Sequence, residues 1–245
     1  MNQKVFFEGE FGKICGILNL IENSTEIAIV IHGFSSTKDN TSGKIIEEEF
    51  SQLNISTLRI DLDNQGESDL EFKYGFVSNY ITQVNSAIAY CQSLGFKHIS
   101  LIGGSYGGVV TLAVAAQRDD LKRLFLRCPG IGTFYYQYLK DKTSQNYIDV
   151  KNGGTINTHG EEFDIEILND MEQYYPLTQL AKQITIPTGI VHGTKDETIP
   201  YEDTIEFSKE IENCELTIIN GASHNLGVGE DFSEWRGALV EFFNK

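Results

Sequence analysis

The hydrophobic pattern of this chain alternates between two kinds of segment. Short, branched apolar runs of the kind that form buried parallel strands occur at 26–31, 56–60, 98–103, 121–126, 188–192 and 215–219. Two further strands are predicted at 5–8 and 14–20, before the first of these runs. Helices are predicted at 45–53, 77–94, 106–117, 201–211 and 232–243. Strands that alternate with helices predict the α/β class, with a mostly parallel central sheet and helices on both faces.

The alternation breaks after Pro129-Gly130 and returns near residue 184. The segment 131–183 is polar and rich in tyrosine, and it contains no long apolar strand. We predict a core made of 1–130 and 184–245, with 131–183 inserted as a small cap subdomain, because an unstructured loop of this length is unusual in a compact domain. The aromatic residues of this segment are interpreted mainly as the cap's own small core, although such rings can also line a slot for an apolar or phenolic acyl group. They are Phe134, Tyr135, Tyr136, Tyr138, Tyr147, Phe163, Tyr174 and Tyr175.

Charge and composition narrow the range of partners. The 245 residues carry a formal net charge of −16, which repels phosphate backbones and anionic lipid, so we expect no nucleic-acid or membrane partner. The four cysteines are widely spaced and are expected to be reduced thiols. Residues 1–10 lack a secretion-signal pattern, and no apolar run is long enough to span a bilayer. We therefore expect a soluble cytoplasmic protein, and a homodimer is left open.

One motif carries the candidate chemistry. Residues 103–107 read G-G-S-Y-G, a G-x-S-x-G sequence that follows a buried strand and precedes a helix. A sharp strand-to-helix turn holds the central serine in a strained conformation and lifts its hydroxyl above the sheet edge. Ser105 is therefore the candidate nucleophile; the alternative is a glycine-rich packing turn with a surface serine.

A serine nucleophile needs a base, and the chain has five histidines. Only His224 lies in a loop after the last strand and in the serine, acid, histidine order of this fold. Structural roles are expected for the other four, which are His32, His98, His159 and His192.

The acid is expected after the strand 188–192, where Asp196 and Glu197 are both available. Two backbone N–H groups should hold the oxyanion. One belongs to Tyr106, the residue after the nucleophile, and the other to Phe34 in the loop after the strand 26–31.

Several runs of the sequence match a known family. They are His32-Gly33-Phe34, Asp61 to Asp69 (DLDNQGESD), Gly103 to Gly108 (GGSYGG), Pro187 to Pro200 with its H-G-T-K-D run, and Gly221-Ala222-Ser223-His224. The chain resembles α/β-hydrolases of the serine-aminopeptidase-like branch, and most closely the bacterial feruloyl (cinnamoyl) esterases. The resemblance implies that Asp196, and not Glu197, is the triad acid, and it places the oxyanion donors on Phe34 and Tyr106.

Three departures from the family pattern bear on the substrate. Gly104 stands where these esterases usually have histidine, Asn64-Gln65 replaces the usual Gly-His, and the insertion is shorter. The leading hypothesis is a serine esterase that cleaves feruloyl, cinnamoyl or short-to-medium acyl esters of small molecules and needs no metal or organic cofactor. The alternatives are a peptidase that acts on short peptides or amino-acid amides, and a catalytically silent binding protein with the hydrolase fold.

Overall fold

The computed structural model describes residues 2–10, 12–62, 66–70, 76–132, 141–158, 161–227 and 232–245. Its strands are β1 (Asn2–Gly9), β2 (Gly12–Asn19), β3 (Glu26–Ile31), β4 (Ser56–Ile60), β5 (Asp69–Leu70), β6 (His98–Gly104), β7 (Arg123–Arg127), β8 (Ile156–Thr158), β9 (Glu161–Phe163), β10 (Thr188–Gly193) and β11 (Cys214–Ile219). Its helices are α1 (Thr41–Gln52), α2 (Val77–Ser93), α3 (Tyr106–Ala115), α4 (Gln145–Lys151), α5 (Ile165–Glu172), α6 (Thr178–Ala181), α7 (Tyr201–Ser208) and α8 (Ser233–Phe243).

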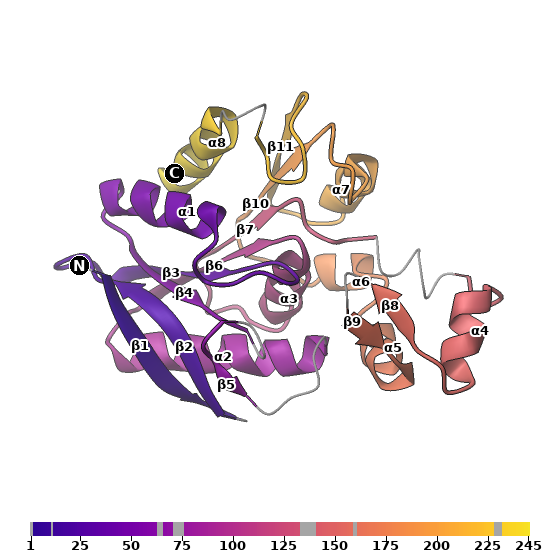
Figure 1. Cartoon of the computed structure of the whole chain (residues 1–245). Coiled ribbons are helices and arrows are strands. Elements are labelled where there is room, and N and C mark those ends of the chain that lie inside the picture. Colours follow the sequence, from indigo (N-terminus) through magenta and orange to yellow (C-terminus); the bar gives the residue numbers. More distant parts are fainter. Residues whose placement is uncertain are drawn as a thin grey trace.

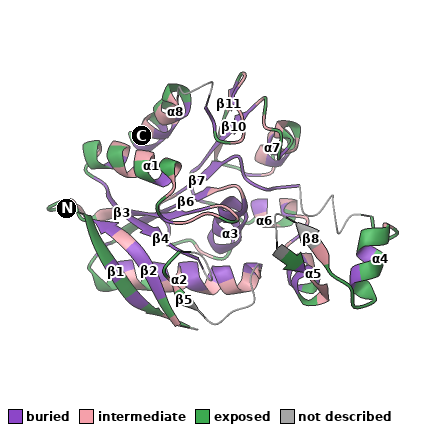
Figure 2. Cartoon of the chain, in the orientation of Figure 1, coloured by how far each residue is buried: buried purple, intermediate pink, exposed green. Residues whose placement is uncertain are grey.

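Within these residues the main sheet has the strand order β1-β2-β4-β3-β6-β7-β10-β11, and β5 pairs with β2 (Figure 1). The strands from β4 to β11 in this order are parallel, whereas β1 and β2 are antiparallel. Apolar residues of α1 and α8 pack on one face of the sheet, and those of α2, α3 and α7 pack on the other. This is the predicted α/β architecture, and burial is concentrated in the parallel strands and α3 (Figure 2).

The predicted elements agree with the observed ones except near their ends. Helix α1 begins at Thr41, four residues before the predicted start at 45, because the Asn40 side chain caps it by accepting the Gly43 N–H at 2.7 Å. The apolar stripe that guided the prediction begins only at Ile45. Strand β7 begins at Arg123, two residues after the predicted start at 121, because Arg123 is the first residue that pairs with β6, opposite Ser100.

The segment between β7 and β10 folds locally and contributes no strand to the main sheet among its described residues. It holds α4, the β8–β9 hairpin, α5 and α6, which gather at one end of the molecule in Figure 1. Phe163 of β9 lies with its ring centroid 5.7 Å from that of Phe34, so the segment contacts the loop after β3. The aromatic residues 134–136 and 138 and His159 lie outside the described residues.

The parallel strands place their carboxyl ends at one edge of the sheet, where ligands bind in open α/β folds. Loops that follow β3, β6, β10 and β11 carry Phe34, Ser105, Asp196 and His224. The four cysteines are free thiols, and three of them are buried. No helix in the described ranges is long and apolar enough to cross a lipid bilayer.

Candidate active site

Ser105 sits in a strained turn between β6 and α3. Its backbone has φ 53° and ψ −121°, a conformation that a residue with a side chain rarely adopts. The Ser105 N–H donates to the Arg127 carbonyl at 2.9 Å, and its own carbonyl accepts from Gly108 and Gly130 at 3.0 Å. The turn is therefore held by neighbouring backbone on both sides.

The two glycines of the G-x-S-x-G motif are required by close packing. A Cβ on Gly103 would lie 2.3 Å from the Thr111 hydroxyl oxygen, and one on Gly107 would lie 2.3 Å from the His32 carbonyl oxygen. Neither distance is compatible with a side chain. Gly33 is close to the serine as well, since its Cβ would lie 3.1 Å from the Ser105 Cβ. The loop after β3 is thus packed directly against the candidate nucleophile.

His224 and Asp196 form a hydrogen-bonded pair. His224 Nδ1 is 2.7 Å from Asp196 Oδ2, and because a carboxylate only accepts, the Nδ1 atom must carry the proton. In the neutral imidazole this leaves Nε2 unprotonated. The Asp196 side chain is fully buried, whereas that of His224 is partly exposed. Glu197, the rival acid, is exposed.

Ser105 and His224 line one cavity of about 470 Å³ together with Gly33 and Phe34, and Asp196 lies behind His224, to which it is hydrogen-bonded. Between the described side chains no hydrogen bond joins Ser105 to His224 in this geometry. Hydrogen bonds of this kind are often long before substrate binds.

Tyr106 is the first residue of α3, and the first N–H groups of a helix have no acceptor within it. The rings of Phe34 and Tyr106 contact edge to face, with centroids 5.9 Å apart.

A comparison with models of protein families identifies the family of this chain. Residues 78–245 match the model of the prolyl oligopeptidase family of peptidases. The chain belongs to the prolyl oligopeptidase family.

Two individual proteins match this chain over part of their length. Non-heme chloroperoxidase CPO-A1 from Kitasatospora aureofaciens is 36% identical over 74 residues, which are 29% of this chain and 27% of that protein. Proline iminopeptidase PfmaB from Pestalotiopsis fici is 31% identical over 175 residues, which are 54% of this chain and 62% of that protein. The matched region thus spans less than two thirds of either relative.

Among solved structures, ferulic acid-bound Est1E from Butyrivibrio proteoclasticus superposes with a TM-score of 0.86 at 23% identity, over 98% of both chains. This likeness confirms the α/β-hydrolase fold that the sequence motifs predict.

Within this family fold, Asp196 has more partners than the sequence indicated. Its Oδ1 accepts the N–H groups of Thr198 at 2.9 Å and Ile199 at 2.8 Å. Its Oδ2 lies 3.0 Å from Nε2 of His192, a histidine with no exposed side-chain surface. His192 Nε2 also faces the Ile199 carbonyl oxygen at 3.2 Å, and because both of its neighbours are acceptors, Nε2 carries the proton. Nδ1 of the neutral ring then accepts from the buried Thr204 hydroxyl at 2.8 Å.

These contacts determine the charge of the acid. Burial alone would raise the pKa of Asp196, but hydrogen bonds from His192, His224 and the Ile199 amide bring it below its ordinary value. Asp196 is therefore ionised at neutral pH. From the sequence, His192 was expected to have a structural role, and its contact with Asp196 was not predicted. The four-residue spacing in H-G-T-K-D was the available signal, because a tight turn after a strand brings the two side chains together.

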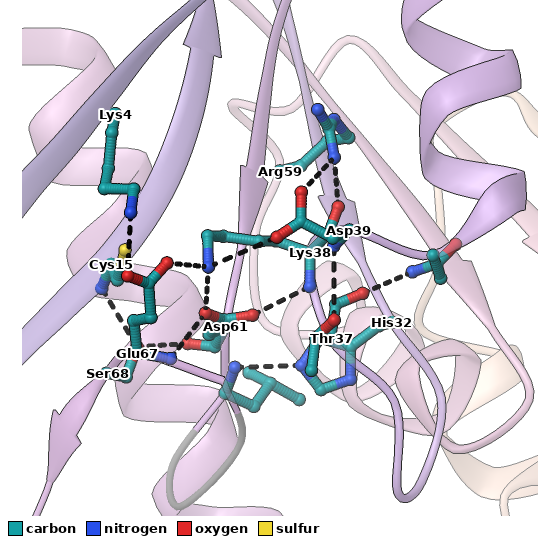
Figure 3. Close-up of polar contacts among 12 residues, drawn as sticks. Lys4, Cys15, His32, Thr37, Lys38, Asp39, Arg59, Asp61, Glu67 and Ser68 are labelled. Atoms are coloured by element: carbon teal, nitrogen blue, oxygen red, sulfur yellow. Dashed lines mark hydrogen bonds and ion pairs between the residues drawn. The ribbon is translucent and has the colours of Figure 1, made fainter.

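A buried ion-pair network lies beneath the loop after β3 (Figure 3). Lys38 donates from Nζ to Asp61 Oδ2 at 2.6 Å and to Glu67 Oε2 at 2.8 Å, and its backbone N–H donates to Asp61 Oδ1 at 2.7 Å. Arg59 donates to the Lys38 carbonyl. Burial would lower the pKa of Lys38, but the bonds to Asp61 and Glu67 raise it above its usual range. Asp63, Asn64 and Gln65 of the same sequence motif lie outside the described residues.

His32 connects Leu62, which follows Asp61 of this network, to the backbone of the loop after β3. Its Nδ1 lies 2.8 Å from the Gly33 carbonyl oxygen and its Nε2 accepts the Leu62 N–H at 3.0 Å, so both ring nitrogens are occupied in the neutral form. Burial lowers the pKa of His32, which keeps it neutral. The histidine thus orients the peptide group whose N–H belongs to Phe34.

Two clusters in the described residues have the composition of metal ligands, namely Cys128 with Asp196 and His224, and Cys15 with Asp61 and Glu67. In the first, Asp196 and His224 bind each other, and burial raises the pKa of the Cys128 thiol. In the second, both carboxylates bind Lys38. We therefore assign neither cluster as a metal centre.

Proposed function

We propose that the protein is a serine hydrolase that cleaves carboxylic esters, with Ser105 as nucleophile, His224 as general base and Asp196 as the orienting acid. The observation that carries this proposal is the His224–Asp196 hydrogen bond of 2.7 Å at the cavity that Ser105 also lines. The positive φ of Ser105 supports it, because this strain is typical of a nucleophile at a strand-to-helix turn.

The proposed reaction follows from these positions. When substrate binds, His224 Nε2 accepts the Ser105 proton and the serine oxygen attacks the ester carbonyl carbon. The Phe34 and Tyr106 N–H groups hold the resulting oxyanion. His224 then protonates the leaving alcohol, and the acyl group stays on Ser105. Water next attacks the acyl-enzyme with His224 as base, which releases the acid and restores the serine. Asp196 stays ionised throughout and stabilises the imidazolium.

Amide hydrolysis is the second candidate function. The prolyl oligopeptidase family match and the partial similarity to a proline iminopeptidase favour it. The fold likeness to a ferulic acid-bound esterase supports ester cleavage. We propose the ester as the substrate because an alkoxide leaving group needs less help from the site than an amine, and the described residues supply one proton donor, His224, at the nucleophile.

We further propose that the inserted segment 131–183 acts as a cap over the acyl group. The contact between Phe163 and Phe34 supports this role, since Phe34 lines the cavity. Aromatic rings at this position would favour an acyl chain or a phenolic ring over a charged group on the cap side.

A substrate panel tests the proposal. Purified protein, Ser105→Ala and the control Ser93→Ala would be compared on p-nitrophenyl acetate, butyrate and octanoate, methyl ferulate, and prolyl and alanyl p-nitroanilide. Ser93 is an exposed residue at the end of α2 and serves as a matched control. We expect ester turnover in wild type and Ser93→Ala and its loss in Ser105→Ala. Faster turnover of an anilide than of every ester would assign the protein to the peptidases, and ester turnover that survives in Ser105→Ala would refute the mechanism.

A further inference from the structure

The cavity beside Ser105 has a second wall that the proposed mechanism does not use. This wall is formed by the loop before α1, the first residues of α1 and the guanidinium of Arg127, with Asn225 and Phe232 at its edge. Helix α1 lies on the same side of the sheet as α8, away from the β8–β9 hairpin (Figure 1). The side chains here therefore meet a different part of the substrate than Phe34 and the inserted segment do.

Arg127 is a buried cation without an acidic partner among the described residues. Its exposed fraction is 9%, and its guanidinium carbon lies 4.6 Å from the centre of the Trp235 ring. Nη2 donates to the Asn225 carbonyl at 3.3 Å, and the buried Nε has no hydrogen-bond partner. Arginine stays charged in proteins, and an uncompensated buried charge costs several kcal/mol. Such a group in a cavity wall indicates that an anion completes it.

The guanidinium lies beside the nucleophile. A Cβ on Gly104 would be 3.2 Å from Nη1 of Arg127, and Gly104 is the residue before Ser105. The absence of a side chain at Gly104 therefore leaves the space that the guanidinium occupies. An anion bound to Nη1 would share one cavity of about 470 Å³ with the scissile bond.

The start of α1 adds to the positive potential of the same wall. This twelve-residue helix has no acidic residue in its first turn, and its N-terminal residues Thr41, Ser42 and Gly43 line the cavity. The end of a helix of this kind acts as roughly half a positive charge. Asp39, just before the cap, is exposed and pairs with Lys38 and Arg59 at 3.7 Å, so its charge is engaged outside the cavity. Positive potential is thus concentrated here in a chain of net charge −16.

We propose that this wall binds a carboxylate carried by the substrate, so that the preferred substrate is an ester with a carboxylate a few atoms from the scissile bond. The proposal rests on the hydrolase function proposed above. A carboxylate is favoured over a phosphate because Arg127 is the single cationic side chain among the described lining residues, whereas phosphate groups are commonly recognised by clusters of arginines. Planar carboxylates also accept two parallel hydrogen bonds from arginine.

Two esters of equal length test the proposal. We would measure kcat/KM for p-nitrophenyl pentanoate and for mono-p-nitrophenyl glutarate, in which a carboxylate replaces the terminal methyl. Wild type, Arg127→Gln and Arg123→Gln would be compared. Arg123 lies at the other end of β7, with its guanidinium 5.6 Å from the Phe243 ring, and its removal changes the net charge equally. We expect the glutarate-to-pentanoate ratio to fall roughly 30-fold or more in Arg127→Gln and to stay unchanged in Arg123→Gln.

Inhibition provides a second readout that does not depend on which side of the ester carries the carboxylate. Glutarate should inhibit p-nitrophenyl acetate turnover competitively, with an inhibition constant at least tenfold higher in Arg127→Gln. Inorganic phosphate should inhibit more weakly than glutarate, and stronger inhibition by phosphate would overturn the choice of a carboxylate. If Arg127→Gln does not fold, Arg127→Lys keeps the charge and removes the planar fork, and a smaller fall in the ratio is expected.

The outcomes separate this proposal from the proposed function. Turnover of both esters with the same ratio in Arg127→Gln and Arg123→Gln would overturn the carboxylate site and leave the hydrolase intact; so would a wild type that glutarate does not inhibit. Failure to turn over either ester, together with failure of a fluorophosphonate to label Ser105, would instead refute the hydrolase function.

Discussion

The substitution Gly107→Ala tests how the turn that carries Ser105 and the loop after β3 depend on each other. An alanine Cβ at this position would lie 2.3 Å from the His32 carbonyl oxygen and 2.7 Å from that of Ile31. Carbon and oxygen in van der Waals contact need about 1 Å more than the shorter distance. Because both obstacles are backbone atoms at the end of β3, the strand end itself must move.

The size of the effect follows from that displacement. Overpacking of a tightly packed site lowers the free energy of unfolding by about 1–3 kcal/mol. For a domain of this length, each kcal/mol lowers the melting temperature by about 2–4 °C, so we expect a fall of roughly 2–12 °C. The moved segment carries Phe34, a proposed oxyanion donor, and a misplacement of about 1 Å costs on the order of a hundredfold in kcat.

The assay needs a glycine control of the same chemistry. Gly237 lies within α8, and a Cβ there meets no atom within 4 Å, so Gly237→Ala should raise the unfolding free energy by about 0.5–1 kcal/mol. Thermal melts and p-nitrophenyl acetate kinetics would be recorded for both variants. If Gly107→Ala has the same melting temperature and the same kcat as Gly237→Ala, the packing argument for the turn around Ser105 is wrong.

Three further predictions concern the polar groups that surround the site. Asp196→Asn should lower kcat by roughly 10⁴-fold, as measured by ester kinetics, because the His224 tautomer is no longer fixed. His192→Phe should lower the unfolding free energy by about 1.5–3 kcal/mol at pH 7, since a buried carboxylate loses one donor. The folded pKa of Asp196 is below its ordinary value of 3.8, so the stability that the ionised carboxylate contributes is present above that pH and is lost as the pH falls through the folded pKa. Urea titrations should therefore find that the difference in unfolding free energy between wild type and His192→Phe shrinks below about pH 4. A difference that stays constant with pH would contradict the assignment. Lys38→Met should cost about 3–5 kcal/mol because Asp61 is left buried and unpaired, and the double variant with Asp61→Asn should recover stability in the same urea titrations.

The central elements could be predicted from the sequence because their signals are local. The apolar stripe of α2 and the branched runs of the parallel strands depend only on residues within each segment, and their observed bounds differ from the predicted ones by a residue or two. The start of α1 was missed because it depends on a side-chain cap at Asn40 and not on apolar periodicity. The short β8–β9 hairpin has too few residues to establish an alternating pattern.

The residues of the candidate site also fall into those that could be predicted from the sequence and those that could not. Ser105 and His224 could be named as candidates because the order of strands and loops determines which residues can meet at the sheet edge. The choice of Asp196 over Glu197 came from the family resemblance. The roles of His192 and Arg127 could not be found in this manner. Each lies in a buried strand where a structural role is the ordinary expectation, and its significance depends on a partner, or on the lack of one, that only tertiary packing reveals.

Covalent labelling tests the central claim most directly. The folded protein would be treated with a fluorophosphonate, digested, and analysed by mass spectrometry, with Ser105→Ala and Ser93→Ala as the matched pair. We predict stoichiometric modification of the peptide that contains Ser105 in wild type and Ser93→Ala, and no modification in Ser105→Ala. An unlabelled wild type, or a label on a different residue, would contradict the assignment of Ser105 as an activated nucleophile.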